Sequence, residues 1–258
     1  MVNAKFDNRV ALVTGAGGLI GSATCRMLAE AGVKVAVTDL TAEATARVVD
    51  PLRERGLEAR GYELDLTSSS SVRAAVSAIE RDYGRIDILV NNAGVWDHGG
   101  SRGRQAFETI PEEQWVRLLR LNVEGTLRVT QIVLPGMYAR GYGRIINLGS
   151  IAGVVGLPGA CDYSASKGAI SLLTRALAME AAGRGVTVNA VSPGWVEKDV
   201  RAIPGTWIGR TGLPEEMARA ILFFADDDAG FTTGTELPVD GGRVLGPHGE
   251  IRFDPVKA

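Results

Sequence analysis

Residues 9–21 read RVALVTGAGGLIG, a short apolar run followed by a glycine-rich turn. Residues 9–14 predict a buried β-strand, and the amphipathic residues 19–31 predict the helix that follows it. The backbone N–H groups of such a turn can approach a phosphate at the start of a helix. The Gly-x-Gly-x-x-Gly pattern of dinucleotide sites is incomplete, because Ile20 stands at its sixth position. A turn that binds no nucleotide therefore stays an alternative at this point.

The alternation of strand and helix continues along the chain. Strands are predicted at 33–38, 60–64, 86–90, 144–148, 186–191 and 236–239, and helices at 42–55, 68–83, 111–140, around Tyr163 and at 214–225. Such alternation, with several strands apolar throughout, predicts α/β architecture: a doubly wound parallel sheet of about seven strands, covered on both faces. No linker or repeat divides it. We expect one domain over 1–258, with a cofactor half at about 7–110, a catalytic and substrate half at about 111–242, and a tail at 243–258.

Composition excludes several classes of protein. Of 258 residues, 45% are hydrophobic and 22% charged, and the formal net charge is -2. This is ordinary globular composition without the basic surface that nucleic acid or an anionic membrane requires. The chain shows no membrane-spanning run and no signal-peptide core. Its two cysteines form no disulfide framework or four-thiolate zinc site. We expect a cytoplasmic protein without a metal.

Asp39 follows the second predicted strand. A carboxylate there can accept hydrogen bonds from the ribose hydroxyls of an adenosine and repel a 2′-phosphate. No Arg or Lys occurs within residues 16–18 or beside Asp39 to neutralise that phosphate. The sequence therefore favours NAD over NADP, with an Asp that merely caps a helix as the alternative.

The segment 150–167 reads SIAGVVGLPGACDYSASK and carries the candidate chemistry. Ser150 follows an apolar strand, and Tyr163 and Lys167 are four residues apart at the start of a predicted helix. Residues at i and i+4 share a helix face, and an ammonium beside a phenol lowers the phenol's pKa. Tyr163 would then exchange protons near neutral pH. By itself, this spacing also occurs by chance on surface helices.

Taken together, these motifs resemble those of the short-chain dehydrogenase/reductase family. The resemblance covers about residues 7–242 and includes Thr14-Gly15-x-x-x-Leu19-Ile20-Gly21, Asp65-Leu66, Asn91-Asn92-Ala93-Gly94, Asn122, Ser150, Tyr163-x-x-x-Lys167 and Pro193-Gly194. Leu19 stands where the family has a glycine. We expect ordinary backbone at Leu19 or a slight shift of the turn, with Gly17 and Gly18 supplying the permissive dihedral angles instead.

The resemblance implies a Rossmann-type fold and a set of site residues. The implied catalytic residues are Asn122, Ser150, Tyr163 and Lys167. The implied cofactor contacts are Gly15, Gly17, Gly18, Leu19, Ile20, Asp39, Asp65, Leu66, Asn92, Ala93, Gly94, Tyr163, Lys167, Pro193, Gly194 and Val196. The family is commonly tetrameric through its long helices, so we expect a homotetramer or a homodimer.

Departures from the family's pattern bear on the substrate. Lys198 replaces the usual Thr that contacts the carboxamide, so Asp199, Thr206 or backbone would take over that contact. The lid at 195–208 looks short, and the loop at 95–107 looks long. Candidate substrate contacts are Trp96, His98, Cys161, Trp195 and Trp207, with Ile203 and Pro204 as further apolar walls. Solvation is the alternative for His98, Arg102 and Arg104, and packing is the alternative for Cys161.

Three functions are compatible with these residues. The leading hypothesis is an NAD-dependent enzyme that transfers a hydride between nicotinamide C4 and a secondary alcohol or ketone, with Tyr163 as general acid/base. A reductase of 3-oxoacyl thioesters is the alternative within the family, although it would be expected to use NADP and a longer lid. A non-catalytic dinucleotide-binding regulator is the alternative from another class.

Overall fold

A seven-stranded parallel sheet forms the centre of the molecule. The computed structural model describes residues 6, 8–96 and 104–246. The strand order is β3-β2-β1-β4-β5-β6-β7, and all the pairings are parallel. The strands are β1 (Val10–Thr14), β2 (Lys34–Asp39), β3 (Ala59–Glu63), β4 (Ile88–Asn91), β5 (Gly143–Leu148), β6 (Val186–Pro193) and β7 (Glu236–Val239). The predicted doubly wound α/β fold is confirmed, including the number of strands.

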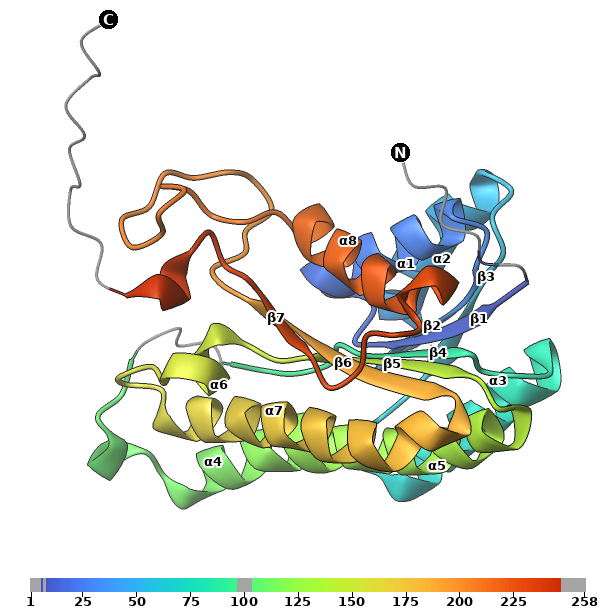
Figure 1. Ribbon diagram of the computed structural model, residues 1–258, viewed down its shortest axis with the longest axis horizontal. Helices are drawn as coiled ribbons and strands as arrows, with labels where there is room; N and C mark the ends of the chain where they lie inside the picture. Colours follow the sequence, from blue (N-terminus) through green and yellow to red (C-terminus); the bar gives the residue numbers. More distant parts are fainter. Residues whose placement is uncertain (1–5, 7, 97–103, 247–258) are drawn as a thin grey trace, which may run out of the picture.

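Helices cover both faces of this sheet (Figure 1). One layer holds α1 (Leu19–Glu30), α2 (Ala42–Glu54) and α8 (Pro214–Ala225). The other holds α3 (Ser69–Tyr83), α4 (Glu112–Leu119), α5 (Thr126–Arg140) and α7 (Cys161–Ala181). A short helix, α6 (Ile151–Val155), precedes α7, and short 3₁₀ turns span Phe107–Thr109, Ala182–Arg184, Asp227–Ala229 and Arg243–Leu245. Within the described ranges, no helix is both long and apolar enough to cross a bilayer.

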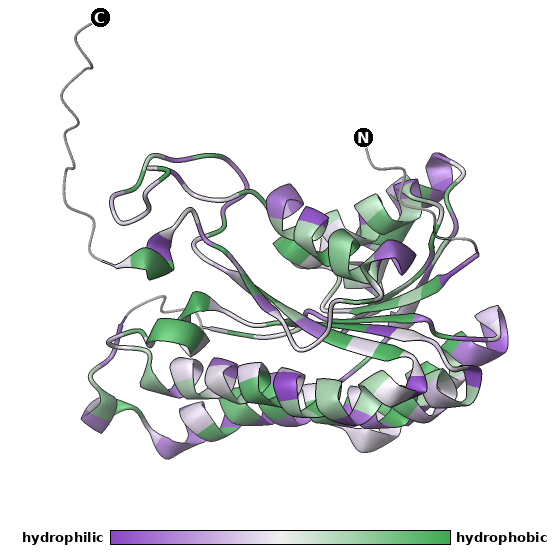
Figure 2. Ribbon diagram, in the orientation of Figure 1, coloured by the Kyte–Doolittle hydropathy of each residue, from purple (hydrophilic) through white to green (hydrophobic). Residues whose placement is uncertain are grey.

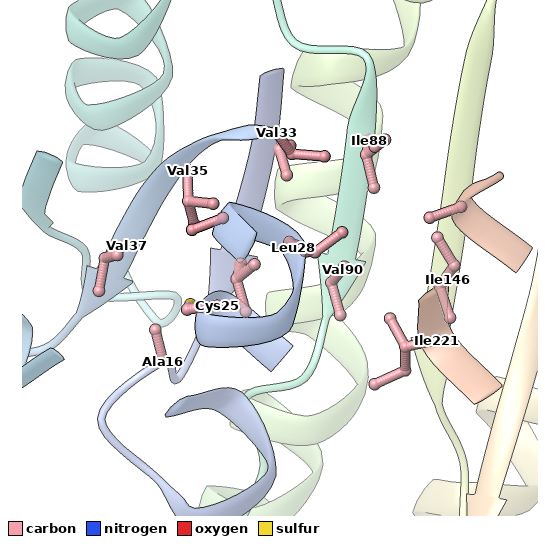
Figure 3. Close-up of a cluster of buried hydrophobic side chains, with 14 of the residues drawn as sticks. Ala16, Cys25, Leu28, Val33, Val35, Val37, Ile88, Val90, Ile146 and Ile221 are labelled. Carbon is pink, nitrogen blue, oxygen red and sulfur yellow. The ribbon is translucent and has the colours of Figure 1, made fainter. Parts of the chain in front are cut away.

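Each face of the sheet packs against its own helices. On the α1–α8 side, Val35, Val37 and Ile146 from the strands pack with Cys25 and Ile221 from the helices (Figure 3). The opposite core joins strand side chains to α3, α5 and α7. The central strands β1, β4, β5 and β6 are buried along their whole length and carry mostly apolar side chains, whereas the edge strand β3 is largely exposed and polar. Figure 2 shows hydrophilic residues on the helices as well as on the loops.

The helix predicted at 111–140 is present over 112–140, but it contains a π-helical turn. A π-helical turn (Arg120–Gly125) separates α4 from α5. Single π turns inserted in α-helices occur frequently at functional sites, because the extra residue changes which side chains face a neighbouring element. Here the turn contains Asn122, whose side chain is buried.

Candidate active site

A cavity of about 940 Å³ lies at the carboxyl ends of β1, β4, β5 and β6. Parallel sheets bind ligands at this edge, where the strand order reverses between β1 and β4. Every predicted cofactor contact except Gly17 lines the cavity, and so do Ser150, Tyr163 and Lys167. Sequence reasoning missed other lining residues: Thr14, Gly21, Leu40, Leu64, Thr67, Val95, Arg117, Leu121, Leu148 and Gly149. Most of these adjoin a predicted contact in the chain, but Arg117 has no such neighbour.

The glycine-rich turn is closely packed, and its positive φ angle lies at a different glycine from the two that were expected to have one. Gly15 has φ +59°, and a Cβ there would lie 2.7 Å from Ala93 Cα. A Cβ on Gly21 would lie 2.5 Å from Gly15 O. Gly17 and Gly18 have no positive φ, so the prediction that they supply the unusual dihedral angles is wrong. The left-handed residue is Gly15 itself, which lets the chain turn immediately after β1.

The first turn of α1 is open toward the cavity. Gly18 is its N-cap and offers no side chain to the helix, and no acidic residue lies in the first turn. Leu19 begins the helix with ordinary backbone, as expected, and is half exposed. The unpaired N–H groups of a helix start and its partial positive charge together attract phosphate. This turn fits a dinucleotide's pyrophosphate.

Two carboxylates, those of Asp39 and Asp65, line this cavity. Asp39 Oδ2 accepts a hydrogen bond from Gly17 N at 2.8 Å, and its Oδ1 accepts one from Leu40 N at 2.7 Å. The glycine-rich turn therefore fixes the orientation of this carboxylate. Asp65 accepts hydrogen bonds from the hydroxyl and the backbone N–H of Thr67, which lower the pKa of its carboxyl.

Asn91 and Asn92 tie the cavity to the sheet. Asn91 Nδ2 donates to Asn147 Oδ1 at 2.8 Å and to Thr130 Oγ1 at 3.0 Å, which joins β4 to β5 and α5. Asn92 Nδ2 donates to the carbonyls of Thr14 and Gly15 at 2.8 and 2.9 Å. These two amides hold the central strands and the glycine-rich turn together.

Ser150 and Tyr163 both line the cavity, and their side chains are hydrogen-bonded to each other. Ser150 is the N-cap of α6, and its Oγ accepts a hydrogen bond from Ala152 N at 3.1 Å. Burial raises the pKa of the Tyr163 phenol, and a hydrogen bond with the Ser150 side chain opposes that rise. The Tyr-Lys spacing predicts a lowered pKa for Tyr163, but in the polypeptide by itself the net shift is upward, since desolvation of the phenolate dominates.

Lys167 is buried one helical turn after Tyr163. Its Nζ donates a hydrogen bond to Leu148 O at 2.7 Å and lies 5.8 Å from the centre of the Tyr163 ring. Burial lowers the pKa of Lys167 to about 8. A Cβ on Gly94 would lie 3.5 Å from this nitrogen, so glycine at this position keeps the space beside the ammonium open.

Asn122 lies behind Gly94 and does not line the cavity. Its Oδ1 accepts a hydrogen bond from Val95 N at 2.9 Å, and its Nδ2 donates to Val95 O at 2.8 Å and to Ser166 Oγ at 3.2 Å. The amide thereby fixes the chain that follows β4. Asn122 and Lys167 flank the same glycine, because a Cβ on Gly94 would lie 3.3 Å from Asn122 Oδ1.

Glu236 joins the three segments that carry Gly149, Ser171 and Ser192. Its Oε1 accepts hydrogen bonds from Ser192 Oγ at 2.5 Å and from Ser171 Oγ at 3.0 Å. A Cβ on Gly149 would lie 3.2 Å from that same oxygen. Ser192 precedes Pro193-Gly194, and Ser171 lies one turn after Lys167. No motif in the sequence marks Glu236, a single acidic residue in a short strand.

The predicted substrate residues fall in different places. Trp96 lines the cavity and packs edge-on against Tyr163. Trp195, Trp207 and Cys161 do not line it. Trp195 is exposed and donates a hydrogen bond to Glu197, and Cys161 is exposed at the start of α7.

Two of the candidate residues in the loop after β4, His98 and Arg102, lie outside the described residues. Arg104 packs against Gly159. Bridges between Val196 and Gly212 and between Ala202 and Arg210 fold the lid segment back on itself.

Known proteins share both the sequence and the fold of this chain. The family model for short chain dehydrogenases matches residues 9–206. The acetoacetyl-CoA reductase of Rhizobium meliloti (strain 1021) is 39% identical over 250 residues, which cover 92% of this chain and 99% of that protein. An NAD⁺-bound xylitol dehydrogenase structure is 36% identical with a TM-score of 0.86, over 92% of this chain and 100% of that one.

A gluconate 5-dehydrogenase from Burkholderia cenocepacia J2315, in complex with NADP and tartrate, is 33% identical with a TM-score of 0.87. The match covers 95% of this chain and 98% of that one. These similarities extend over nearly the whole chain and agree with the cavity, its glycine-rich turn and its Ser, Tyr and Lys side chains. The chain is an oxidoreductase of the short-chain dehydrogenase/reductase family.

Proposed function

We propose that this protein transfers a hydride between C4 of NAD(H) and a secondary alcohol or ketone. The observation that carries the proposal is the meeting of Ser150, Tyr163 and Lys167 in one cavity with the Asp39 carboxylate and the open start of α1. The nicotinamide dinucleotide, when bound, accepts or donates the hydride. The polypeptide has to orient the substrate and move one proton.

The proposed roles follow from the placement of the side chains. In the oxidation direction, the Tyr163 oxygen accepts the hydroxyl proton of the alcohol. Ser150 Oγ donates a hydrogen bond to the substrate oxygen, where it stabilises negative charge in the transition state. The buried Lys167 ammonium favours ionised Tyr163 and hydrogen-bonds a ribose hydroxyl. Asn122 and its hydrogen-bonded partner Val95 position a water that connects Lys167 to solvent. Reduction reverses these steps.

The preference for NAD rests on Asp39. Its carboxylate lines the cavity and is held by two backbone N–H groups, so it cannot easily turn away from a ribose. A 2′-phosphate beside it would bring two negative charges together. Steady-state kcat/KM values with NAD and NADP test the preference, and a higher value with NADP would contradict it.

The substrate is tested with a panel that separates the candidate functions. Cyclic, aromatic and sugar alcohols test the leading proposal. A 3-oxoacyl thioester tests the alternative, which similarity to an acetoacetyl-CoA reductase favours. Turnover that disappears in Tyr163→Phe supports either enzyme. Dinucleotide binding without turnover on any member of the panel would instead favour a regulator.

We also propose that the protein forms a homotetramer or homodimer. The outer faces of α5 and α7 expose apolar side chains, among them Leu127, Leu172 and Met179. Exposed apolar patches of this kind mark association surfaces. Sedimentation of the protein and of Leu172→Glu measures the state, and a monomer under all concentrations would contradict the proposal.

A further inference from the structure

A second hollow lies outside the active-site cavity, between α1, α2 and the lid. It has a volume of about 320 Å³, and we call it the α1–α2 groove. Its lining residues are Leu19, Ser22, Ala23, Arg26, Arg47, Val48, Pro51, Leu52, Arg55, Lys198, Pro214 and Glu215. This volume is at the lower end of the range for small-molecule sites. Figure 1 shows α1, α2 and α8 packed side by side on this face of the sheet.

The groove concentrates positive charge on a chain whose net charge is -2. Four of its lining side chains are cationic and one, Glu215, is anionic. Arg26 pairs with Glu215 at 2.8 Å, and Arg55 pairs with Glu30 at 2.8 Å. Within the described part of the chain, Arg47 and Lys198 have no carboxylate within ion-pair distance. Unpaired cations around a hollow attract an anion from solution.

The remaining lining is apolar. Val48, Leu52 and Pro51 come from α2, Ala23 from α1, and Pro214 from the start of α8. An apolar wall next to guanidinium groups suits a ligand with a flat ring and phosphate oxygens, since the ring covers apolar surface and guanidinium binds phosphate in a bidentate manner. That combination is the chemistry of a nucleoside phosphate.

The groove adjoins the active-site cavity without being part of it. Leu19 lines both hollows, and one residue of the lid, Glu197, separates Val196, on the cavity, from Lys198, on the groove. Asp39 and the predicted cofactor contacts Asp65 and Leu66 line only the cavity. A ligand in the groove would therefore contact the lid and the first turn of α1 while the dinucleotide site remains available.

We propose that the α1–α2 groove binds the phosphate groups of a nucleoside phosphate other than the nicotinamide dinucleotide. Two sources share this chemistry: the phosphorylated adenosine of a coenzyme A thioester substrate, and a free adenine nucleotide that acts on the lid. The first source rests on the proposed reduction of thioesters. Binding itself does not depend on any turnover.

Calorimetric titration of the NADH-saturated protein with ADP tests the site directly. Saturating NADH prevents ADP from binding at the dinucleotide site. We expect one ADP per chain, no saturable binding of adenosine, and an affinity that falls about tenfold in Arg47→Ala, since one charged hydrogen-bonding partner is lost. Arg73→Ala is the matched control, because Arg73 is an exposed arginine on α3, on the opposite face of the sheet.

Three results would overturn the proposal. They are an absence of ADP binding once NADH is saturating, an unchanged ADP affinity in Arg47→Ala, and a selective loss of NADP binding in Arg47→Ala. The last result would assign the cations to the 2′-phosphate of the dinucleotide.

Two substrates with the same reacting group separate the sources. Acetoacetyl-CoA carries the phosphorylated adenosine, and acetoacetyl-N-acetylcysteamine does not. If the groove holds the substrate's carrier, Arg47→Ala raises KM about tenfold for the first substrate only. If the ligand is a free nucleotide, Arg47→Ala affects both substrates equally, and ADP changes the turnover of the cysteamine ester in the wild type but not in Arg47→Ala. ADP binding that alters neither reaction would overturn the connection to the lid.

Discussion

The indole of Trp96 meets the phenol of Tyr163 edge-on, with ring centres 5.8 Å apart and planes inclined by 82°. This T-shaped contact is a favourable geometry for two aromatic rings. It places an apolar wall against the phenol ring whose oxygen is proposed to exchange the substrate's proton.

Removal of this wall is expected to weaken substrate binding selectively. Trp96→Ala should raise KM for an apolar substrate about tenfold, because the substrate loses an aromatic contact worth about 1.5 kcal/mol. The Kd of NADH, measured by fluorescence titration, should stay within about twofold. Trp96→Phe retains a ring and serves as the control. Equal losses of NADH and substrate affinity in Trp96→Ala would show that Trp96 supports the whole cavity instead.

Tyr163→Phe is expected to remove the proton-transferring group while it preserves the ring. We expect kcat to fall by about 10³-fold, within the range of general acid/base contributions, with little change in the Kd of NADH. Stopped-flow single turnovers would locate the loss in the chemical step. A kcat near that of the wild type would exclude Tyr163 as the acid/base.

The pH dependence of oxidation is expected to report the Tyr163–Lys167 pair. Oxidation requires deprotonated Tyr163, so its rate should rise with pH through the apparent pKa of this phenol. Lys167→Met removes a positive charge, which raises that pKa and should move the rising limb to higher pH by about one unit. Profiles of kcat/KM from pH 6 to 10 measure the shift. A limb at lower pH in Lys167→Met would contradict the proposed role of Lys167.

Asp39 is expected to determine the choice of cofactor. Asp39→Ala should shift the ratio of kcat/KM for NAD over NADP toward NADP by about tenfold, because it removes a negative charge beside the 2′ position. Asp39→Asn, which keeps the shape of the side chain, should produce part of the same shift. An unchanged ratio in both variants would show that other residues select the cofactor.

The ion pair between Arg210 and Glu216 is expected to make stability depend on pH. Arg210 donates to Glu216 at 2.7 Å and lowers the pKa of its carboxyl to about 2. A lowered pKa stabilises the fold fully above the ordinary value near 4.5, and this contribution disappears as the pH falls toward 2. Glu216→Gln should therefore lower Tm at pH 7, and its difference from the wild type should shrink below pH 4. A difference that is constant with pH would contradict this origin.

The sequence predicts the sheet and most of the cavity because these depend on local patterns. Apolar runs predict the strands. The glycines at 15 and 21 mark the turn between β1 and α1, because backbone approaches there too closely for a side chain. The π turn at 120–125 has no such pattern, since no residue type in this segment marks the one-residue shift of its hydrogen bonds.

Properties that depend on distant segments were not predictable in the same way. The raised pKa of Tyr163 results from burial that the local Tyr-Lys spacing does not reveal. Glu236 meets Ser171 and Ser192 only after β6 and β7 pair. Likewise, Arg47 and Lys198 are far apart in the sequence, and only the packing of α2 beside the lid brings them to one groove.

The π turn also has a consequence for how this chain can change in length. It holds one residue more than an α-helical turn would, and deletion of one residue within 120–125 would let α4 and α5 join as a regular helix. The joined helix would be rotated by about 100° on one side of the junction, since an α-helix has 3.6 residues per turn. If α4 rotates, Arg117 and Leu121 would leave the cavity wall. If α5 rotates, the Asn122 side chain would lose its hydrogen bonds to the Val95 backbone. A deletion that makes this helix more regular should therefore abolish the site.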